Sequence, residues 1–408
     1  MKSQAKKAVS PKRSRRVFVG LSGGVDSAVS AALLKKDGYE VTGVFIKAWD
    51  PSTELRVNYH QKYPCTWKED RRSAMRAAAI LNIPFITLDL EKEYKKEVVD
   101  YMIAEYKEGR TPNPDVMCNK EIKFGHFLKF ALDPLAGGGA DFVATGHYAQ
   151  TSLLAPLLAK ERGRPSLLGR GEVLMEAKDK NKDQSYFLWT LTQEQLKHTL
   201  FPIGHLQKEE VRKLAVKFGL PQATRKDSQG LCFLGKIDMK EFLREYIKTK
   251  KGDVLNEKGE VIGEHDGAEL YTLGERHGFR VFNEKTNSQP LYVVSKDIKK
   301  NTLTVASKSS PSKSPRPPGT TPSRTGVSQL RSTRLSSKSF SFQLQNQNWI
   351  SGETPKGEIS CRIRYRGSKI KCRIENNEVF FGDEILMASG QSVVFYKDEI
   401  CLGGAIMA

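Results

Sequence analysis

A glycine-rich turn between an apolar run and a helix-forming run constrains this chain most. Val17–Val19 are apolar, Gly23 and Gly24 lie in the turn, and Ser27 opens a stretch rich in alanine and leucine. This order predicts a strand, a tight loop and a helix. Glycine adopts backbone angles closed to other residues, and the first amides of a helix have no intrahelical partner, so the loop is suited to bind a phosphate. An ordinary strand-to-helix turn is the alternative.

The exact string narrows these alternatives. Residues 22–27 read Ser-Gly-Gly-Val-Asp-Ser, without the lysine of a Walker loop and without the G-x-G-x-x-G fingerprint. The string resembles the pyrophosphate loop of the N-type ATP pyrophosphatases. That resemblance implies cleavage of ATP to AMP and pyrophosphate, with the adenylate activating an oxygen as a leaving group. It does not identify that oxygen.

Charge, length and cysteine usage limit the number of domains, the kind of partner and the compartment that this chain can have. The 408 residues are enough for two or three domains, and the formal net charge of +19 favours a polyanionic partner such as nucleic acid. A charged tail or linker would account for part of that excess. No apolar run approaches about 18 residues, so we expect no membrane span. Six scattered cysteines without a C-x-x-C pair argue against a disulfide scaffold or zinc site and for a reducing compartment.

Strands and helices alternate through the first half of the chain. Strands are expected at 41–46, 84–88 and 142–145, with helices at 69–81 and 91–106. Such alternation predicts an α/β fold, a parallel sheet with helices on both faces, whose ligands bind at the carboxyl ends of the strands. His147 follows one of these ends, where it is either a satisfied loop histidine or a functional one.

Two cysteines stand in chemically suggestive surroundings. Cys118 follows a proline-rich segment whose Asn or Asp would cap a helix beginning at Glu121, so the helix dipole would favour its thiolate. The alternative is a buried, inert cysteine behind a capped helix. Asp115 would lie within reach of whatever Cys118 touches. Cys232 follows a charged loop with Arg225 and Lys226, which would lower the pKa of a nearby thiol.

Later segments are polar and then β-like. Residues 182–184 could contact phosphates or base edges, or could cap a helix at 185–190. A helix is expected at 208–218, and short strands with glycine turns follow from about residue 238. Three arginines, Arg362, Arg364 and Arg366, alternate on one expected strand, as a phosphate-binding face or a solvated one.

The chain therefore divides into four expected regions. Residues 1–16 form a basic leader, which is either a mitochondrial targeting segment or an arm that touches nucleic acid or nothing. The α/β catalytic domain would span 17–237, a small central β-rich domain 238–290, and a C-terminal β-barrel 291–408. A Ser-, Pro-, Lys- and Arg-rich insertion at 307–339 is expected to be disordered within the barrel.

Several segments in this order resemble one family. Asn-Pro-Asp-x-x-Cys at 113–118, Ala-Thr-Gly-His-Tyr at 144–148, Lys-Asp-Gln-Ser-Tyr-Phe-Leu at 182–188 and Gly-x-Cys-Phe at 230–233 all resemble segments of the tRNA-specific 2-thiouridylases, the MnmA/TRMU family. So do Tyr-Thr-Leu-Gly-Glu-Arg at 271–276 and the end of the chain. The resemblance runs from about Arg16 onward and omits the leader and the insertion. Glu275 stands where the family more often has glutamine, and the insertion suggests a eukaryotic version.

The resemblance implies ATP-dependent placement of sulfur on C2 of the wobble uridine of tRNA. It implies ATP contacts by Gly20, Leu21, Ser22, Gly23, Gly24, Val25, Asp26, Ser27, Ile46 and Gly146. It implies tRNA contacts by Asn113, Pro114, Asp115, His147, Lys182, Asp183, Gln184, Arg364, Tyr365 and Gln391. Asp115 would be the general acid/base, Cys232 the persulfide carrier, and Cys118 the partner that forms a disulfide with Cys232 on sulfur release.

The implied cofactors are ATP and Mg²⁺, with no protein metal site. The implied partners are tRNAs for glutamate, lysine and glutamine and a sulfur donor such as a cysteine desulfurase or a persulfide relay protein. We expect a monomer without membrane association, in mitochondria or otherwise in the cytoplasm. Two other functions stay open on the residues alone. One is another ATP pyrophosphatase-type ligase acting on a nucleotide or amide, and the other is a non-catalytic tRNA-binding protein.

Overall fold

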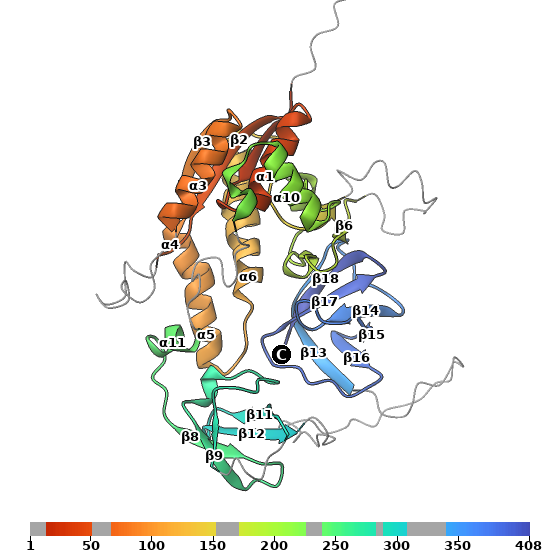
Figure 1. Cartoon of the computed structure of the whole chain (residues 1–408). Helices are drawn as coiled ribbons and strands as arrows, with labels where there is room; N and C mark the ends of the chain where they lie inside the picture. Colours follow the sequence, from red (N-terminus) through yellow and green to blue (C-terminus); the bar gives the residue numbers. More distant parts are fainter. Residues whose placement is uncertain (1–13, 51–66, 152–170, 226–238, 283–288, 308–339) are drawn as a thin grey trace, which may run out of the picture.

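The computed structural model describes residues 14–50, 67–151, 171–225, 239–282, 289–307 and 340–408, and Figure 1 shows their arrangement. A parallel five-stranded sheet with the order β3-β2-β1-β4-β7 forms the first domain. Its strands are β1 (Arg16–Gly20), β2 (Glu40–Lys47), β3 (Phe85–Asp89), β4 (Phe142–Ala144) and β7 (Thr199–Leu200). The strands agree with the expected ones to within one residue at each end, and the sheet gains β7.

Helices cover both faces of this sheet. Val17 and Val19 pack with α1 (Val25–Lys36), α3 (Trp67–Ile80) and α10 (Lys208–Lys217). Phe18 and Val44 face the opposite way. They share a core with the π-helical η3 (Cys118–Phe127) and α7 (Leu128–Leu132). This alternation follows the period of two of a strand buried on both faces.

One long helix carries the chain from the sheet toward the second domain (Figure 1). It consists of α4 (Glu91–Tyr94), the π-helical η2 (Lys95–Asp100) and α5 (Tyr101–Lys107). Its buried face, including Val98 and Met102, shares one hydrophobic core with Phe242, Val254 and Leu303 of the second domain. The expected helix at 91–106 is therefore confirmed, with a π-helical middle.

The second domain is a five-stranded sheet with the order β10-β9-β8-β12-β11. It comprises α11 (Met239–Arg244), β8 (Gly252–Leu255), β9 (Val261–His265), the short η7 (Ala268–Leu270), β10 (Arg280–Val281), β11 (Leu291–Asp297) and β12 (Thr302–Ser307). The expected boundary at residue 291 is wrong. Strand β12 pairs with β8, because β11 and β12 form a hairpin that completes this sheet and not the barrel.

The third domain is a closed six-stranded barrel. Its strands are β13 (Phe340–Trp349), β14 (Ile359–Arg362), β15 (Ile370–Glu375), β16 (Glu378–Phe381), β17 (Ser392–Lys397) and β18 (Ile400–Met407). The order β13-β16-β15-β14-β17-β18 closes through pairing of β13 with β18. The predicted fold class is thus confirmed. The expected disordered insertion lies outside the described residues except for Ser307, which ends β12.

A hairpin of the first domain extends the barrel sheet. Strands β5 (Ala149–Thr151) and β6 (Leu174–Glu176) pair with each other, and β6 pairs with the start of β18. The rest of β18 pairs with β13. One barrel strand is therefore shared between the closure of the barrel and its attachment to the first domain.

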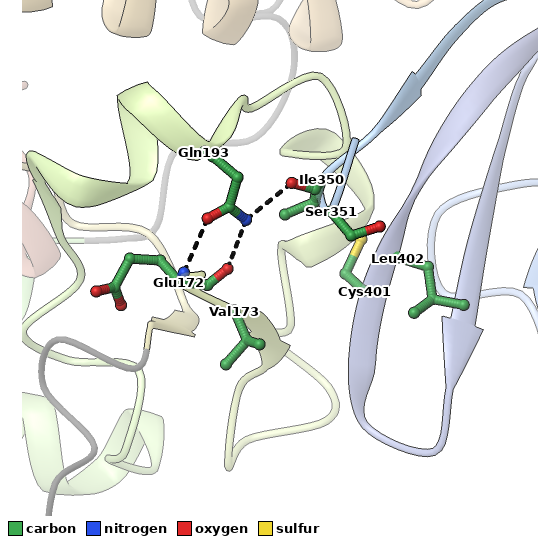
Figure 2. Close-up of a pocket in the computed structure, with 7 residues that line it drawn as sticks. All are labelled: Glu172, Val173, Gln193, Ile350, Ser351, Cys401 and Leu402. Carbon is green, nitrogen blue, oxygen red and sulfur yellow. Dashed lines mark hydrogen bonds between the residues drawn. The ribbon is translucent and has the colours of Figure 1, made fainter. Parts of the chain in front are cut away.

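Side-chain amides join the same two domains nearby. Figure 2 shows Gln193, at the start of α9 (Gln193–Lys197), with its Nε2 donating to the carbonyl oxygens of Glu172 (2.7 Å) and Ile350 (2.8 Å). They surround a cavity of about 10 Å³, roughly the space of one water molecule. Asn348 of the barrel donates in turn to the carbonyl of Trp189 at 2.7 Å. These hydrogen bonds of Gln193 and Asn348 hold the barrel against the catalytic domain.

None of the helices in the described ranges combines the length and the apolar character needed to cross a membrane. Two further short helices are η5 (Ser185–Phe187) and η6 (Pro221–Thr224). The helix expected at 185–190 is thus a single 3₁₀ turn.

Candidate active site

The loop between β1 and α1 has the tight geometry that the glycines predicted. Gly23 has φ +80°, and a Cβ there would lie 2.3 Å from the carbonyl oxygen of Asp70 in α3. The Gly23 carbonyl accepts hydrogen bonds from Ser73 Oγ (2.9 Å) and Arg225 Nη1 (2.9 Å). Arg225 also pairs with Asp70. The loop is therefore held in shape from α3 and from the segment after η6.

The helix that follows offers its amino end to an anion. Gly24 is the N-cap of α1 and supplies no side-chain cap. The Ser22 and Ser27 hydroxyl oxygens lie 3.2 Å apart beside it. Gly146, at the end of β4, sits so close that a Cβ would lie 2.5 Å from the Ser27 nitrogen. A helix start without a side-chain cap leaves backbone amides of the kind that bind a phosphate, as the sequence predicts for this loop.

Other residues expected at the nucleotide form the walls of this loop. Gly20 ends β1, and Leu21 and Val25 are buried in the core. Ile46 lies near the end of β2 and packs partly against two core clusters. The side chains of Leu21 and Val25 point into the core and support the loop. Any nucleotide contact by these two residues must therefore come from the backbone.

Asp26 forms an ion pair that the sequence did not reveal. Lys208 Nζ lies 2.7 Å from Asp26 Oδ1 and 2.9 Å from Oδ2, and the Tyr148 hydroxyl donates to Oδ1 at 2.9 Å. Lys208 is the first residue of α10 and is buried. Nothing in the spacing of Asp26 and Lys208 signals this contact, because it depends on how α10 packs against α1.

The Asn-Pro-Asp-x-x-Cys segment forms the start of a helix. Asn113 Oδ1 accepts from the Val116 nitrogen at 3.2 Å, and Pro114 is the first residue of α6 (Pro114–Met117), which continues into η3. The helix expected to begin at Glu121 thus begins seven residues earlier. Cys118 consequently lies in the second turn, beyond the first turn in which the dipole acts most, and is buried.

Asp115 stands in this first turn with an unusual ionisation. Burial raises the pKa of its carboxyl above the ordinary value, and the charge of Lys123 partly offsets this. A carboxyl whose pKa is raised can both accept and return a proton nearer neutral pH.

Lys123 and His147 connect this helix to the end of β4. Lys123 Nζ lies 3.3 Å from His147 Nε2, and Thr145 Oγ1 lies 2.8 Å from His147 Nδ1. Burial holds the pKa of His147 well below its usual range, and the Lys123 charge acts in the same direction. Since an ammonium can only donate, neutral His147 accepts at Nε2 and donates from Nδ1–H to Thr145. The sequence analysis singled out His147 and missed Lys123, whose only signal is its place one helical turn and a half after Cys118.

Asp183 lies in a buried ion network and not at the surface. Its carboxylate accepts from the Ala177 nitrogen (3.0 Å) and Ser185 Oγ (3.0 Å) and pairs with Arg362 Nη1 at 2.8 Å. Arg362 also reaches Glu176 Oε1 at 3.0 Å. The expected tRNA contact by the Asp183 side chain conflicts with this geometry, since the carboxylate is 1% exposed.

The neighbours of Asp183 are more accessible. Lys182 and Gln184 are half-buried, and Gln184 Oε1 accepts from the Tyr148 nitrogen at 2.9 Å. That bond ties the loop to the end of β4, next to His147.

The three arginines expected on one strand face separate ways. Strand β14 ends at Arg362, which points into the buried network, whereas Arg364 and Arg366 are exposed in the turn that follows, with Arg366 at φ +58°. Tyr365 packs against Phe187, with ring centroids 4.5 Å apart and ring planes tilted by 45°, and the Arg366 guanidinium carbon lies 5.0 Å from the centre of the Tyr365 ring. The two exposed arginines on either side of Tyr365 in the chain place positive charge on this surface of the barrel.

Gln391 lies at the same end of the barrel, just before β17, whose first residues pair with the end of β14. Its Oε1 accepts from the Ala388 nitrogen at 3.4 Å, and it is half-buried. Cys232 lies outside the described residues, as does the loop before it from residue 226 onward. The expected pairing of Cys118 with Cys232 therefore stays a prediction.

Within the part of the chain that the structure describes, no three His, Cys, Asp or Glu side chains gather at one point. A magnesium ion that accompanies a nucleotide is held largely by phosphate oxygens and water.

Comparisons with known families define the class of protein. Residues 15–236 match the family described as tRNA methyl transferase HUP domain. Residues 240–307 match tRNA methyl transferase PRC-barrel domain, and residues 339–407 match aminomethyltransferase beta-barrel domain. The chain is therefore a HUP-domain protein with two appended β domains, whose boundaries follow the sheets.

Curated relatives narrow the class to one family. The chain is 42% identical to the tRNA-specific 2-thiouridylase MnmA of Streptococcus agalactiae serotype Ia, over 96% of this chain and 95% of the relative. Identity to the protein of the same name from Streptococcus thermophilus is 42%, with the same coverage. The Listeria welshimeri relative is 41% identical over 95% of this chain and 93% of its own length. The chain belongs to the tRNA-specific 2-thiouridylase MnmA family.

Proposed function

We propose that this protein replaces the C2 oxygen of the wobble uridine of tRNA with sulfur, at the expense of ATP. The observation that carries the proposal is the juxtaposition of two sites. An uncapped helix start lies beside Gly146, and the next residue, His147, meets Lys123 of the helix that bears Asp115 and Cys118. Activation of an oxygen and attack on the activated carbon need this proximity.

The first step activates the uridine. The C2 oxygen attacks the α-phosphorus of ATP, the bond to pyrophosphate breaks, and the N3 proton passes to the Asp115 carboxylate. The loop from Ser22 to Ser27 holds the phosphates with its backbone amides. The raised pKa of Asp115 supports its part in taking and returning this proton.

The second step transfers sulfur. The terminal sulfur of a Cys232 persulfide adds to C2, and the bond from C2 to the AMP oxygen breaks. The Cys118 thiolate then attacks the Cys232 sulfur, which breaks the sulfur–sulfur bond and leaves the thione on C2. Asp115 returns its proton to N3. The Cys118–Cys232 disulfide that results needs two electrons from an external thiol reductant before the next turnover.

The partners follow from this chemistry. We propose tRNAs for glutamate, lysine and glutamine as substrates and a cysteine desulfurase or persulfide relay protein as sulfur donor, with the protein acting as a monomer. The exposed Arg364 and Arg366 around Tyr365 support an RNA surface on the barrel. A mitochondrial location rests on the basic leader, and a fluorescent fusion without residues 1–16 that still reached mitochondria would contradict that role for the leader.

Mass spectrometry of nucleosides from an unmodified tRNA tests the proposal. The tRNA is incubated with protein, ATP, Mg²⁺ and a persulfide donor, using wild type, Cys232→Ala and the barrel variant Cys372→Ala. We expect an oxygen-to-sulfur mass gain on the wobble uridine with wild type and Cys372→Ala and none with Cys232→Ala. Pyrophosphate release without any such gain in wild type would refute thiolation.

A further inference from the structure

Residues 109–111, which connect α5 to α6, are contacted by both other domains. From the second domain, Thr272 Oγ1 lies 3.4 Å from Thr111 Oγ1. Ile298 fills the space beside Gly109, where a Cβ would lie 2.4 Å from its Cγ1. From the barrel, the Ser389 carbonyl accepts a hydrogen bond of 2.8 Å from the Thr111 nitrogen. Figure 1 places this connection where the second domain and the barrel approach the catalytic domain.

Gly390 makes the barrel contact possible. It is buried at φ +85°, and a Cβ would lie 2.9 Å from both the Thr111 nitrogen and Arg110 Cβ. The Gly390 nitrogen donates to the Met407 carbonyl at 2.9 Å, and the Met407 nitrogen donates to Gln391 at 2.9 Å. The loop that touches Thr111 is therefore tied to strand β18 and is held by the barrel itself.

The contacted connection leads directly into the reactive helix. Arg110 is held by two hydrogen bonds to Glu105 of α5, at 2.8 and 2.6 Å. Two residues after Thr111, Asn113 caps α6, whose first turn contains Asp115. A shift of Thr111 would consequently move the cap and the carboxylate together.

We infer that Thr111 is a positioning residue, clamped by Ser389 and Gly390 of the barrel and by Thr272 of the second domain, that holds the helix of Asp115 and Cys118 in its reactive place. The inference rests on the proposed function. Gln391, which that function assigns to tRNA, follows Gly390 in the chain. Binding of tRNA at the barrel is therefore linked to the placement of the reactive helix.

Two glycine variants separate this contact from backbone strain. Gly390→Ala introduces a methyl group against Thr111, whereas Gly352→Ala places alanine at a similar φ of +83° in the same barrel with nothing within 4 Å. Misplacement of reacting groups by about 1 Å costs up to about a hundredfold in rate. We expect Gly390→Ala to lower kcat for thiolation about tenfold to a hundredfold with the Kd for tRNA changed less than about twofold. Gly352→Ala should keep the wild-type kcat.

A kcat of Gly390→Ala equal to that of Gly352→Ala would overturn the inference, and so would a rise in KM for tRNA with kcat unchanged. If Gly390→Ala fails to fold, Thr111→Val serves as the second test. This variant removes only the hydroxyl contact to Thr272. We expect its kcat to fall severalfold, and an unchanged kcat would overturn the clamp.

Hydrogen exchange gives a measure that does not depend on activity. Peptides covering residues 109–113 should exchange faster in Gly390→Ala than in wild type or Gly352→Ala, because the Thr111 amide loses its acceptor. Absence of thiolation by the wild-type protein would contradict the proposed function. Hydrogen exchange would still test whether the barrel holds Thr111 in place. Equal exchange in all three proteins would overturn it.

Discussion

The Nζ of Lys123 lies 3.3 Å from Nε2 of His147 and links the helix that carries Asp115 to the strand end beside the glycine loop. The histidine is buried and neutral, and its other nitrogen is held by Thr145 at 2.8 Å. The ammonium is consequently fixed from one side while its charge acts on Asp115. Burial raises the pKa of the proposed general base, Asp115, and a cation placed in this way lowers it in part.

Removal of the Lys123 charge should shift the acidic limb of the pH–rate profile to higher pH. Burial already raises the pKa of Asp115, and Lys123 lowers it, so Lys123→Met should raise it further. The active carboxylate form would then appear only at higher pH. Thiolation rates from pH 5 to 9 measure the limb.

Two variants control for this effect. Lys123→Arg retains the charge and should keep the limb near its wild-type position. Lys120→Met removes a more exposed lysine of the same helix, which pairs with Glu121 at 2.8 Å, and should leave the profile unchanged. If the acidic limb of the pH–rate profile does not move in Lys123→Met, the charge of Lys123 does not set the pKa of Asp115.

Lys208→Met should weaken the glycine loop and the protein together. The change leaves the Asp26 carboxylate with the Tyr148 hydroxyl but without its ammonium partner. Loss of a hydrogen bond to a charged group costs about 1.5–3 kcal/mol. We expect a loss of this size in the free energy of unfolding, measured in urea, and a raised KM for ATP. Lys213→Met, at an exposed position of the same helix, should change neither quantity.

Gly23→Ala should abolish ATP turnover. The alanine would be strained at φ +80°, and its Cβ would lie 2.3 Å from a backbone oxygen of α3, so the loop would have to move. Pyrophosphate release is the measurement. Gly38→Ala carries a similar strain, at φ +85°, with nothing within 4 Å, and should retain turnover. Equal turnover in the two variants would show that the close approach to α3 is unimportant.

Arg362→Ala should destabilise the protein strongly without acting on the chemistry directly. It leaves two buried carboxylates, Asp183 and Glu176, without their shared guanidinium. Breaking a buried ion pair in this way costs about 3–5 kcal/mol. Denaturant unfolding should show that loss, whereas Arg244→Ala, which breaks an exposed pair with Asp266, should cost less than about 1 kcal/mol. A small effect of Arg362→Ala would mean that Lys369 and Lys180 satisfy Glu176 without it.

The pH dependence of stability follows from the same network. Lys369 and Lys180 hold the pKa of Glu176 below its ordinary value of 4.5 against the opposing effect of burial. A depressed carboxyl pKa stabilises the fold above the pKa of the unfolded chain. That contribution should disappear as the pH falls below about 4.5 and through the lower folded pKa. Unfolding curves at pH 3 to 6 of wild type and Glu176→Gln measure it.

Local patterns predicted the fold well where burial is regular. The apolar run before Gly20 and the alternation that follows identify the parallel sheet, because strands buried on both faces read as apolar runs. The assignment of β11 and β12 failed because their local pattern suits either β domain. Only pairing with β8, nearly 50 residues earlier, decides between them.

The sequence predicted the two loops of the candidate site. It did not predict the contacts between residues that are far apart in the chain. Ser22–Ser27 and Asn113–Cys118 are contiguous strings, and their geometry follows from their own glycines, proline and cap. Lys208 and Lys123 carry no such string, since each acts on a residue from another part of the chain. Arg362 was misread because alternation predicts a shared face only while the strand continues, and β14 ends at that residue.

The pairing of β6 with the first residues of β18 joins positions more than 220 residues apart in the chain. During synthesis the hairpin β5–β6 thus carries an unpaired edge, and Glu176 lacks Arg362 and Lys369, until the barrel strands have followed. Non-local pairing of this kind folds slowly, and an exposed edge invites association between chains. The catalytic domain is therefore a poor candidate for expression as a separate fragment, and the barrel serves as the partner that completes its folding.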